Sequence, residues 1–178
     1  MSDVICELKG VKYSYLGKYP ALNGIGLSIR AGEKIGIIGA NGAGKSTLLH
    51  LLDGLIFPDE GSVTMFGQVI TDKAFGDDGF SRSFRKKVGL LFQNPDIQLF
   101  CPTVREDILF GPLQLGMSRG EAEQRLEMFS SMLGLGHLLD RAPFRLSIGE
   151  KKKAALAATL SSDPDLILLD EPTAGIDP

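Results

Sequence analysis

One short stretch of the sequence has the residues and the spacing of a phosphate-binding loop. Gly39 and Gly44 are separated by four residues, and Lys45 and Ser46 follow directly. The glycines allow backbone N–H groups to turn inward around phosphate oxygens, and the following helix N-terminus adds partial positive charge. In this motif the lysine reaches the β- and γ-phosphates, and the serine hydroxyl binds Mg²⁺. The alternative is a chance glycine turn, but an apolar run precedes the motif and a helical pattern follows it, as phosphate binding requires.

Two adjacent acids, Asp170 and Glu171, directly follow the apolar run 166–169. An acid at the end of a buried strand can hold Mg²⁺ through water, and an acid one residue further can orient or deprotonate an attacking water. Taken alone, such a pair could equally be a capped strand end. Downstream of a phosphate-binding loop, the pair favours hydrolysis of a nucleoside triphosphate, with Glu171 as the group that activates the water.

Length, charge and cysteine content limit the classes of protein to consider. The chain has 178 residues, enough for one domain or slightly more, and its net charge is −3. A nucleic-acid-binding domain would be basic, so we expect no nucleic acid partner, and the basic runs 82–87 and 151–153 predict solvated faces. Cys6 and Cys101 lack the spacing of a metal site and predict two free thiols. No apolar run has the length of a membrane span, so we expect a soluble protein.

Apolar runs that alternate with helical patterns predict an α/β fold. Three of the runs, 34–38, 88–92 and 166–169, are apolar almost throughout, which is typical of parallel strands buried on both faces. The earlier strands, with turn-rich spacers, predict an antiparallel layer beside that sheet, and residues 75–83 predict a flexible loop. The predicted strands are 4–8, 27–29, 34–38, 63–66, 88–92 and 166–169, and the predicted helices are 45–54, 118–133 and 149–160.

Taken together, these motifs resemble the ATP-binding subunit of ABC transporters, and the resemblance covers the whole chain. Tyr15 lies 24 residues before Gly39, where the family has an aromatic residue that stacks on adenine. For the tyrosine alone, a place in the core or on a strand face is nearly as good an interpretation. The other matching segments are the Walker A motif (39–46), the Q-loop glutamine Gln93, the ABC signature (146–150), the Walker B motif with its catalytic glutamate (166–171) and the D-loop (174–177).

The resemblance implies a RecA-like P-loop NTPase fold, as a single domain over residues 1–178 with a helical subdomain at about 100–160. It also implies that two such subunits pair head to tail around two ATP molecules, with Ser147 and Gly149 of one subunit facing the γ-phosphate held by the other. The implied catalytic residues are Glu171, Gln93 and Lys45, and the implied Mg²⁺ ligands are Ser46, Gln93 and Asp170. The implied ATP-binding residues are Tyr15, Gly39, Asn41, Gly42, Ala43, Gly44, Lys45, Ser46, Thr47, Ser147, Gly149 and Asp177.

The segment 84–116 resembles the ATPases of energy-coupling-factor importers, particularly the cobalt and nickel type, with Asp96, Gln98 and Leu99 as the most informative residues. This resemblance implies that Mg-ATP hydrolysis powers import through transmembrane subunits, with the protein docked peripherally on the cytoplasmic face of the membrane. The segment after Gln93 would pass the motion to that partner. Three alternatives remain open, namely another ABC importer, a soluble ABC ATPase without a transport role, and an inactive regulatory nucleotide binder.

The sequence departs from the family at two places. In the signature, Ile148 replaces the usual glycine and Glu150 the usual glutamine; because a β-branched residue is hard to place at positive φ, we expect ordinary backbone angles at Ile148. Family members also continue beyond the D-loop into a strand that lies between the Walker A and Walker B strands and ends in a histidine. Neither His50 nor His137 can replace that histidine by position. We therefore expect this chain to be a fragment that is poorly stable and hydrolyses ATP slowly, if at all.

Overall fold

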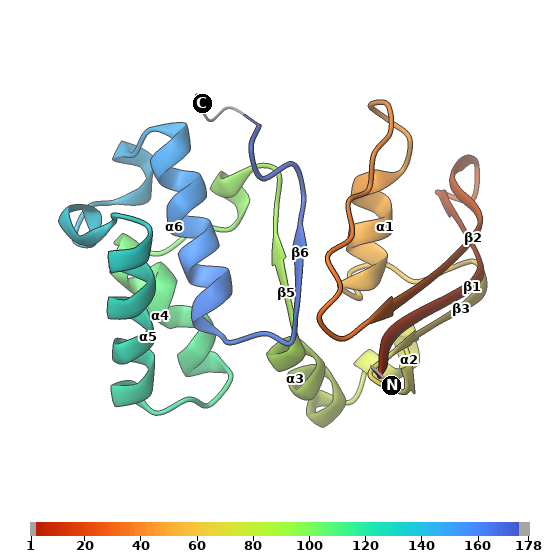
Figure 1. Ribbon diagram of the computed structural model, residues 1–178, viewed down its shortest axis with the longest axis horizontal. Coiled ribbons are helices and arrows are strands. Elements are labelled where there is room, and N and C mark those ends of the chain that lie inside the picture. The colour runs from red at the N-terminus through yellow and green to blue at the C-terminus, as the bar shows by residue number, and fades with distance from the viewer. Residues whose placement is uncertain (1–2, 175–178) are drawn as a thin grey trace. The chain divides into compact units, whose positions relative to one another are not determined.

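The computed structural model describes residues 3–174, and the chain divides into two compact units, Met1–Ser81 and Arg82–Pro178 (Figure 1). Each unit is described by itself below. The prediction of a single domain over the whole chain therefore remains a prediction. Among residues 3–174, no helix is both long enough and apolar enough to cross a membrane.

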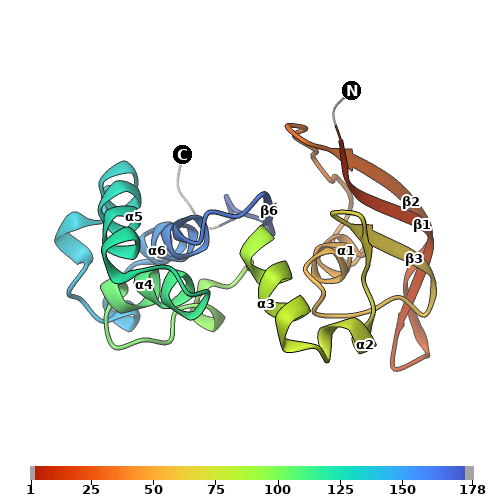
Figure 2. The ribbon, with the colours of Figure 1, turned by 90° about the horizontal axis from the view of Figure 1, so that it is seen from below.

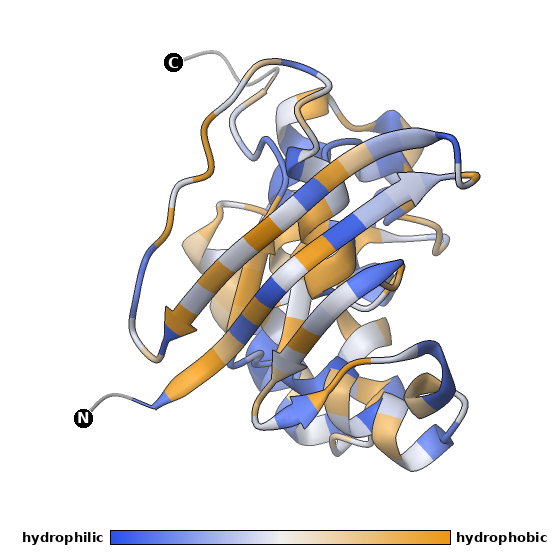
Figure 3. Cartoon of the chain, turned by 90° about the vertical axis from the view of Figure 1, so that its right-hand side faces the viewer, coloured by the Kyte–Doolittle hydropathy of each residue, from blue (hydrophilic) through white to orange (hydrophobic). Residues whose placement is uncertain are grey.

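The first unit is built on an antiparallel sheet of β1 (Val4–Tyr15), β2 (Tyr19–Arg30), β3 (Glu60–Met65) and β4 (Gln68–Val69), in the order β2-β1-β3-β4. Apolar and polar residues alternate along β1 and β2 (Figure 3), as expected for a sheet with one buried face. Cys6 pairs with Met65 and Leu8 with Val63, and all four are buried. The helix α1 (Lys45–Leu52) buries its leucines in the same unit. The prediction that the earlier strands pair in an antiparallel sheet is therefore confirmed.

The run 34–38, predicted as a buried strand, belongs to no sheet among the described residues, and that prediction is wrong for this structure. Ile35, Ile37 and Ile38 are exposed, Ile38 to 98%. The pattern suits burial on both faces, but a strand forms only where a neighbour offers its backbone N–H and C=O groups. None of the described strands pairs with this run.

The predicted flexible loop 75–83 is instead largely helical, in α2 (Asp72–Phe75) and α3 (Asp78–Lys87). The Asp77 carboxylate accepts the backbone N–H of Phe80 at 2.7 Å, which satisfies a donor at the start of α3. The Phe75 ring packs against the Phe57 and Phe80 rings, with centroids 5.6 and 5.3 Å apart. A cap and an aromatic cluster thus order a segment whose glycines and aspartates had suggested a loop.

The second unit combines two parallel strands, β5 (Val88–Leu91) and β6 (Leu166–Leu169), with three helices. The helices α4 (Val104–Gln114), α5 (Arg119–Met132) and α6 (Ile148–Ser161) lie side by side (Figure 2). Their core includes Leu91, Ile108, Leu126, Leu138 and Ala154. The short 3₁₀ helices are η1 (Pro95–Ile97), η2 (Gly136–Leu138) and η3 (Pro143–Arg145).

Helix α4 was not predicted from the sequence as a separate helix, although a signal for it was present. Thr103 and Glu106 form a capping box, in which each side chain accepts the backbone N–H of the other residue. A threonine followed three residues later by glutamate is the sequence signature of such a box. Pro112 within the helix weakens the pattern, because proline is rare in helix interiors.

Candidate functional site

The predicted phosphate-binding loop has the backbone that its glycines suggest. Gly42 and Gly44 have φ of +78° and +86°, a region in which residues with a side chain are strained. Gly44 caps the N-terminus of α1, which has no side-chain cap, so N–H groups of the first helical turn remain available to an anion. Asn41, Gly42 and Ala43 are exposed. The loop therefore presents backbone donors to solvent at a helix start.

Gly44 is also required by space. A Cβ at this position would lie 2.4 Å from the backbone oxygen of Ala21 in β2 and 3.2 Å from the Leu22 side chain. By contrast, a Cβ at Gly39 would make an ordinary contact of 3.4 Å with Ala43. The loop is thus seated against the sheet at its last glycine, where only glycine fits.

The Lys45 ammonium lies over the loop that it follows. It donates to the carbonyl oxygens of Gly39 at 3.0 Å and Ala40 at 2.9 Å. This places positive charge beside the exposed backbone of the loop, where the predicted phosphates would bind. Ser46 is half-buried, with its hydroxyl on the first turn of α1 as a Mg²⁺ ligand would require.

Tyr15 lies next to α1, the helix that follows the predicted phosphate-binding loop, rather than in the core. Its hydroxyl is hydrogen-bonded to the Thr47 hydroxyl at 3.0 Å, and its ring packs edge-on against Tyr13, with centroids 5.1 Å apart. The residue remains 41% exposed. The structure therefore brings the predicted adenine-stacking residue together with Thr47, another predicted nucleotide contact, while the stacking itself stays a prediction.

In the second unit, the ends of β5 and β6 bring three predicted residues together. The Asp170 N–H donates to the Leu91 carbonyl at 3.0 Å, which extends the parallel pairing by one residue. Asp170 is buried, at 5% exposure. Gln93, just beyond β5, donates its side-chain amide to the Glu171 carboxylate at 2.7 Å. The carboxyl ends of parallel strands meet at one edge of a sheet, which is why residues 78 positions apart in sequence are in contact.

The candidate Mg²⁺ ligands fit that ion by their chemistry. A serine hydroxyl, a glutamine amide oxygen and an aspartate carboxylate are oxygen donors, which Mg²⁺ prefers. Ser46 lies in the first unit, whereas Gln93 and Asp170 lie in the second.

The signature segment starts α6, with Ser147 as its N-cap. The Glu150 carboxylate accepts the Ser147 backbone N–H at 2.7 Å and its hydroxyl at 2.8 Å. Both bonds lower the pKa of Glu150, and the bond from the backbone N–H has the larger effect. The Ser147 hydroxyl is therefore engaged by an anionic side chain at the helix N-terminus. Ile148 is the first residue of α6 and has helical backbone angles, which confirms the expectation from its β-branched side chain.

One residue in contact with the pair Asp170 and Glu171 was not predicted from the sequence. The basic run 151–153 was expected to be solvated, but Lys152 is 5% exposed and donates to the Glu171 carbonyl at 2.9 Å. Lys151 also deviates from the prediction, since its side chain is 14% exposed and pairs with Asp96 at 2.6 Å. No sequence signal separates the middle lysine from its neighbours; only the position of α6 beside β6 does so.

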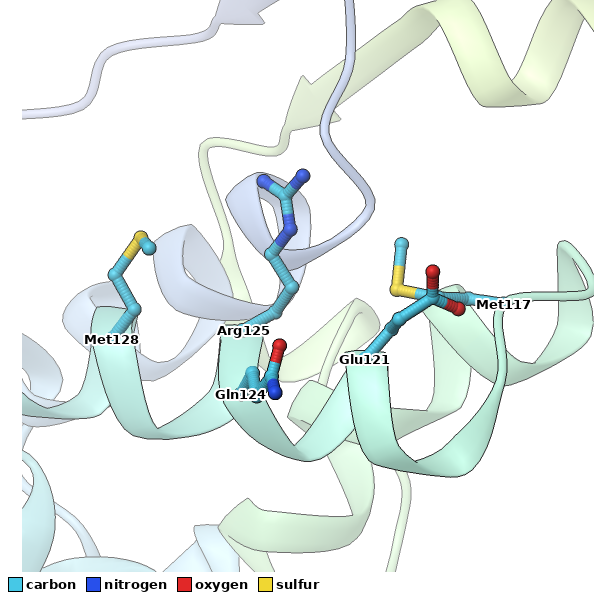
Figure 4. Close-up of a pocket in the computed structure, with 5 residues that line it drawn as sticks. All are labelled: Met117, Glu121, Gln124, Arg125 and Met128. Carbon is cyan, nitrogen blue, oxygen red and sulfur yellow. The ribbon is translucent and has the colours of Figure 1, made fainter.

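A surface pocket of about 340 Å³ lies away from these residues, along α5 (Figure 4). Its lining includes none of the predicted site residues that the structure describes. The cationic lining residue, Arg125, makes two hydrogen bonds with Asp163. The lining residues are Met117, Glu121, Gln124, Arg125 and Met128. The remaining predicted contact, Asp177, lies outside the described residues.

Comparisons with known proteins agree with this geometry. A profile of the ABC transporter family matches residues 22–174. The nickel import ATP-binding protein NikO of Rhodobacter capsulatus is 49% identical over 172 residues, which are 97% of this chain and 67% of NikO. The energy-coupling factor transporter ATP-binding protein EcfA2 of Methanospirillum hungatei is 44% identical over 176 residues, 99% of this chain and 43% of EcfA2.

The fold is also that of a solved ATP-binding cassette. The dimeric structure of a post-hydrolysis state of the cassette MJ0796, bound to ADP and Pi, has a TM-score of 0.85 and 30% identity, covering 97% of this chain and 76% of that one. The likeness confirms the predicted α/β fold of a P-loop NTPase. This chain spans 67% of the length of NikO and 43% of that of EcfA2.

Proposed function

Because this chain belongs to the ABC transporter family, we propose that it binds and hydrolyses Mg-ATP to power an importer of the energy-coupling-factor type, with nickel or cobalt as the cargo. One observation carries the ATPase part. At the ends of β5 and β6, Gln93 contacts Glu171, and Asp170 is the residue before Glu171. The same chain also contains the predicted phosphate-binding loop.

Each of these residues has a role in the proposed reaction. The loop N–H groups and the Lys45 ammonium bind the β- and γ-phosphates and offset their charge. Ser46, Gln93 and Asp170 would hold Mg²⁺, which neutralises charge that develops on the phosphate oxygens. Glu171 orients and deprotonates the attacking water. The Gln93 amide donates to the Glu171 carboxylate, so it orients that carboxylate.

A second ATP-binding subunit completes the proposed site. Ser147 and Gly149 start α6, and a helix N-terminus favours an anion such as the γ-phosphate bound by the partner. Only the ATP state has that phosphate, so ATP favours the closed dimer and hydrolysis releases it. The dimeric state of the related cassette supports this arrangement.

Transmembrane subunits are the other proposed partners, and they would hold the protein at the cytoplasmic face of the membrane. Beyond Gln93, Ile97 and Phe100 are exposed to 62% and 64%, and the Phe100 ring packs edge-on against the half-exposed Phe110. Exposed apolar side chains of this kind are typical of an interaction surface. The names of NikO and EcfA2 support the importer type and the nickel cargo.

Phosphate release from Mg-ATP tests the enzymatic proposal. The purified protein is expected to turn over ATP, and Glu171→Gln is expected to abolish turnover while ATP binding is retained. Turnover that is equal in the variant, or a wild-type protein that does not bind ATP, would contradict the proposal. For the cargo, cells that lack the protein are expected to lose uptake of Ni²⁺ or Co²⁺ and to regain it with the wild-type gene but not with Glu171→Gln.

A further inference from the structure

Lys152 has an environment that is unusual for a lysine. It lies in α6 at 5% exposure, and its ammonium donates to the backbone carbonyl of Glu171 at 2.9 Å. Removing an ammonium from water is costly unless it gains polar partners. The contact therefore joins the helix that starts at Ser147 to the peptide of the residue that activates water.

The backbone of Glu171 needs such support. Its φ is +45°, in the left-handed region that costs a residue with a side chain roughly 1–2 kcal/mol. Its carbonyl oxygen accepts two donors, the Lys152 ammonium at 2.9 Å and the Ala174 N–H at 3.1 Å. The backbone sets the direction in which the Glu171 Cα–Cβ bond leaves the chain, and the carboxylate at the end of this side chain accepts the Gln93 amide.

We propose that Lys152 is a positioning residue for Glu171, an inference that rests on the proposed ATPase function. Its ammonium holds the Glu171 peptide in the left-handed conformation that presents the carboxylate to water. Lys152 and Ser147 belong to the same helix, five residues apart. A shift of α6 when Ser147 meets the nucleotide of a second subunit is therefore passed directly to the Glu171 peptide. Lys152 thus links assembly of the composite site to activation of the water within one subunit.

Three variants of the purified full-length protein test the proposal through ATP turnover. Lys152→Met keeps the aliphatic stem but removes the donor, Lys152→Arg keeps a cationic donor, and Lys153→Met is the matched control at an exposed neighbour. Loss of a hydrogen bond from a charged group predicts a fall in kcat of about tenfold or more for Lys152→Met, with an unchanged Kd for ATP. Lys152→Arg should recover part of the rate, and Lys153→Met should match the wild type.

Two outcomes of the kinetic test would overturn the proposal. A kcat of Lys152→Met equal to that of the wild type refutes the positioning role. Equal losses of ATP binding and turnover, without recovery by Lys152→Arg, would mean that Lys152 only supports the fold.

Hydrogen exchange separates a failure of this inference from a failure of the proposed function. The Ala174 N–H donates to the same Glu171 carbonyl, so Lys152→Met should accelerate exchange at Ala174 relative to Lys153→Met. This measurement needs no turnover. If the wild-type protein has no ATPase activity, the proposed function is refuted. If exchange at Ala174 is unaltered in Lys152→Met, the proposed role of Lys152 is refuted.

Discussion

The substitution Gly44→Ala is expected to destabilise the protein through two separable effects. The first is conformational, because φ of +86° costs alanine about 1–2 kcal/mol. The second is steric, because the new Cβ would lie 2.4 Å from the Ala21 carbonyl oxygen, and relieving such overpacking costs about 1–3 kcal/mol. Together they predict a loss of about 2–5 kcal/mol, a large part of the 5–15 kcal/mol or so that stabilises a typical domain.

Two matched variants isolate the steric effect. Gly42 has φ of +78°, but a Cβ at this position would meet nothing within 4 Å, so Gly42→Ala carries the conformational cost alone. Gly44→Ala and Gly42→Ala also both gain about 0.4–1 kcal/mol, because alanine restricts the unfolded chain. This gain lowers both losses of stability and cancels when the two variants are compared. Gly39→Ala meets only ordinary contacts, the nearest at 3.4 Å, so it should be as stable as the wild type or more stable by up to about 1 kcal/mol.

Chemical denaturation of the four purified proteins measures these differences in the free energy of unfolding. Gly44→Ala should be less stable than Gly42→Ala by about 1–3 kcal/mol. It should also bind ATP more weakly, because relief of the clash displaces the N–H groups at the start of α1. If Gly44→Ala is as stable as Gly42→Ala, the loop is not packed against β2 at Gly44.

Two further predictions concern carboxylates. Glu150→Gln keeps an acceptor for Ser147 but removes negative charge from the N-terminus of α6, so ATP-dependent dimerisation should strengthen several-fold. Light scattering in a Glu171→Gln background measures this dimerisation. Weaker dimerisation would contradict the proposed place of the γ-phosphate. Burial raises the pKa of Asp107, whose Oδ1 accepts the Phe100 and Cys101 N–H groups. A raised pKa means that the folded state holds the proton more tightly, so the contribution of Asp107 to stability falls as pH rises through that pKa. Asp107→Asn should therefore gain stability relative to the wild type as the pH rises above about 4, the usual pKa of an aspartate, in denaturation experiments. A stability difference that does not change with pH would refute this prediction.

Several features were readable from the sequence because they depend on local chemistry. The spacing of Gly39, Gly44 and Lys45 predicted a glycine-containing loop directly before a helix, and Gly44 directly precedes α1. The apolar run 166–169 coincides with β6. The β-branched side chain of Ile148 indicated ordinary backbone angles, and this residue has no positive φ. In each case the residues within one turn or one strand determine the conformation.

Other features depend on which segments become neighbours. The run 34–38 has the composition of a buried strand, yet pairing requires a partner that local sequence does not name, and the run is unpaired among the described residues. Asp77 and the ring of Phe75 convert an apparent loop into helix through contacts that the turn-rich composition hides.

Residue types at short spacing were therefore enough to indicate the chemistry of this protein, through a phosphate-binding loop, an acid pair and a signature. The contacts of Gln93 and Lys152 with Glu171 could not be predicted from residues at short spacing, because Gln93 and Lys152 lie 78 and 19 residues away from Glu171 in sequence. Burial and long-range hydrogen bonds are properties of packed elements, so they appear only once the fold brings those elements together. A lysine in a basic run looks solvated until its helix is placed beside the strand that ends in the acids.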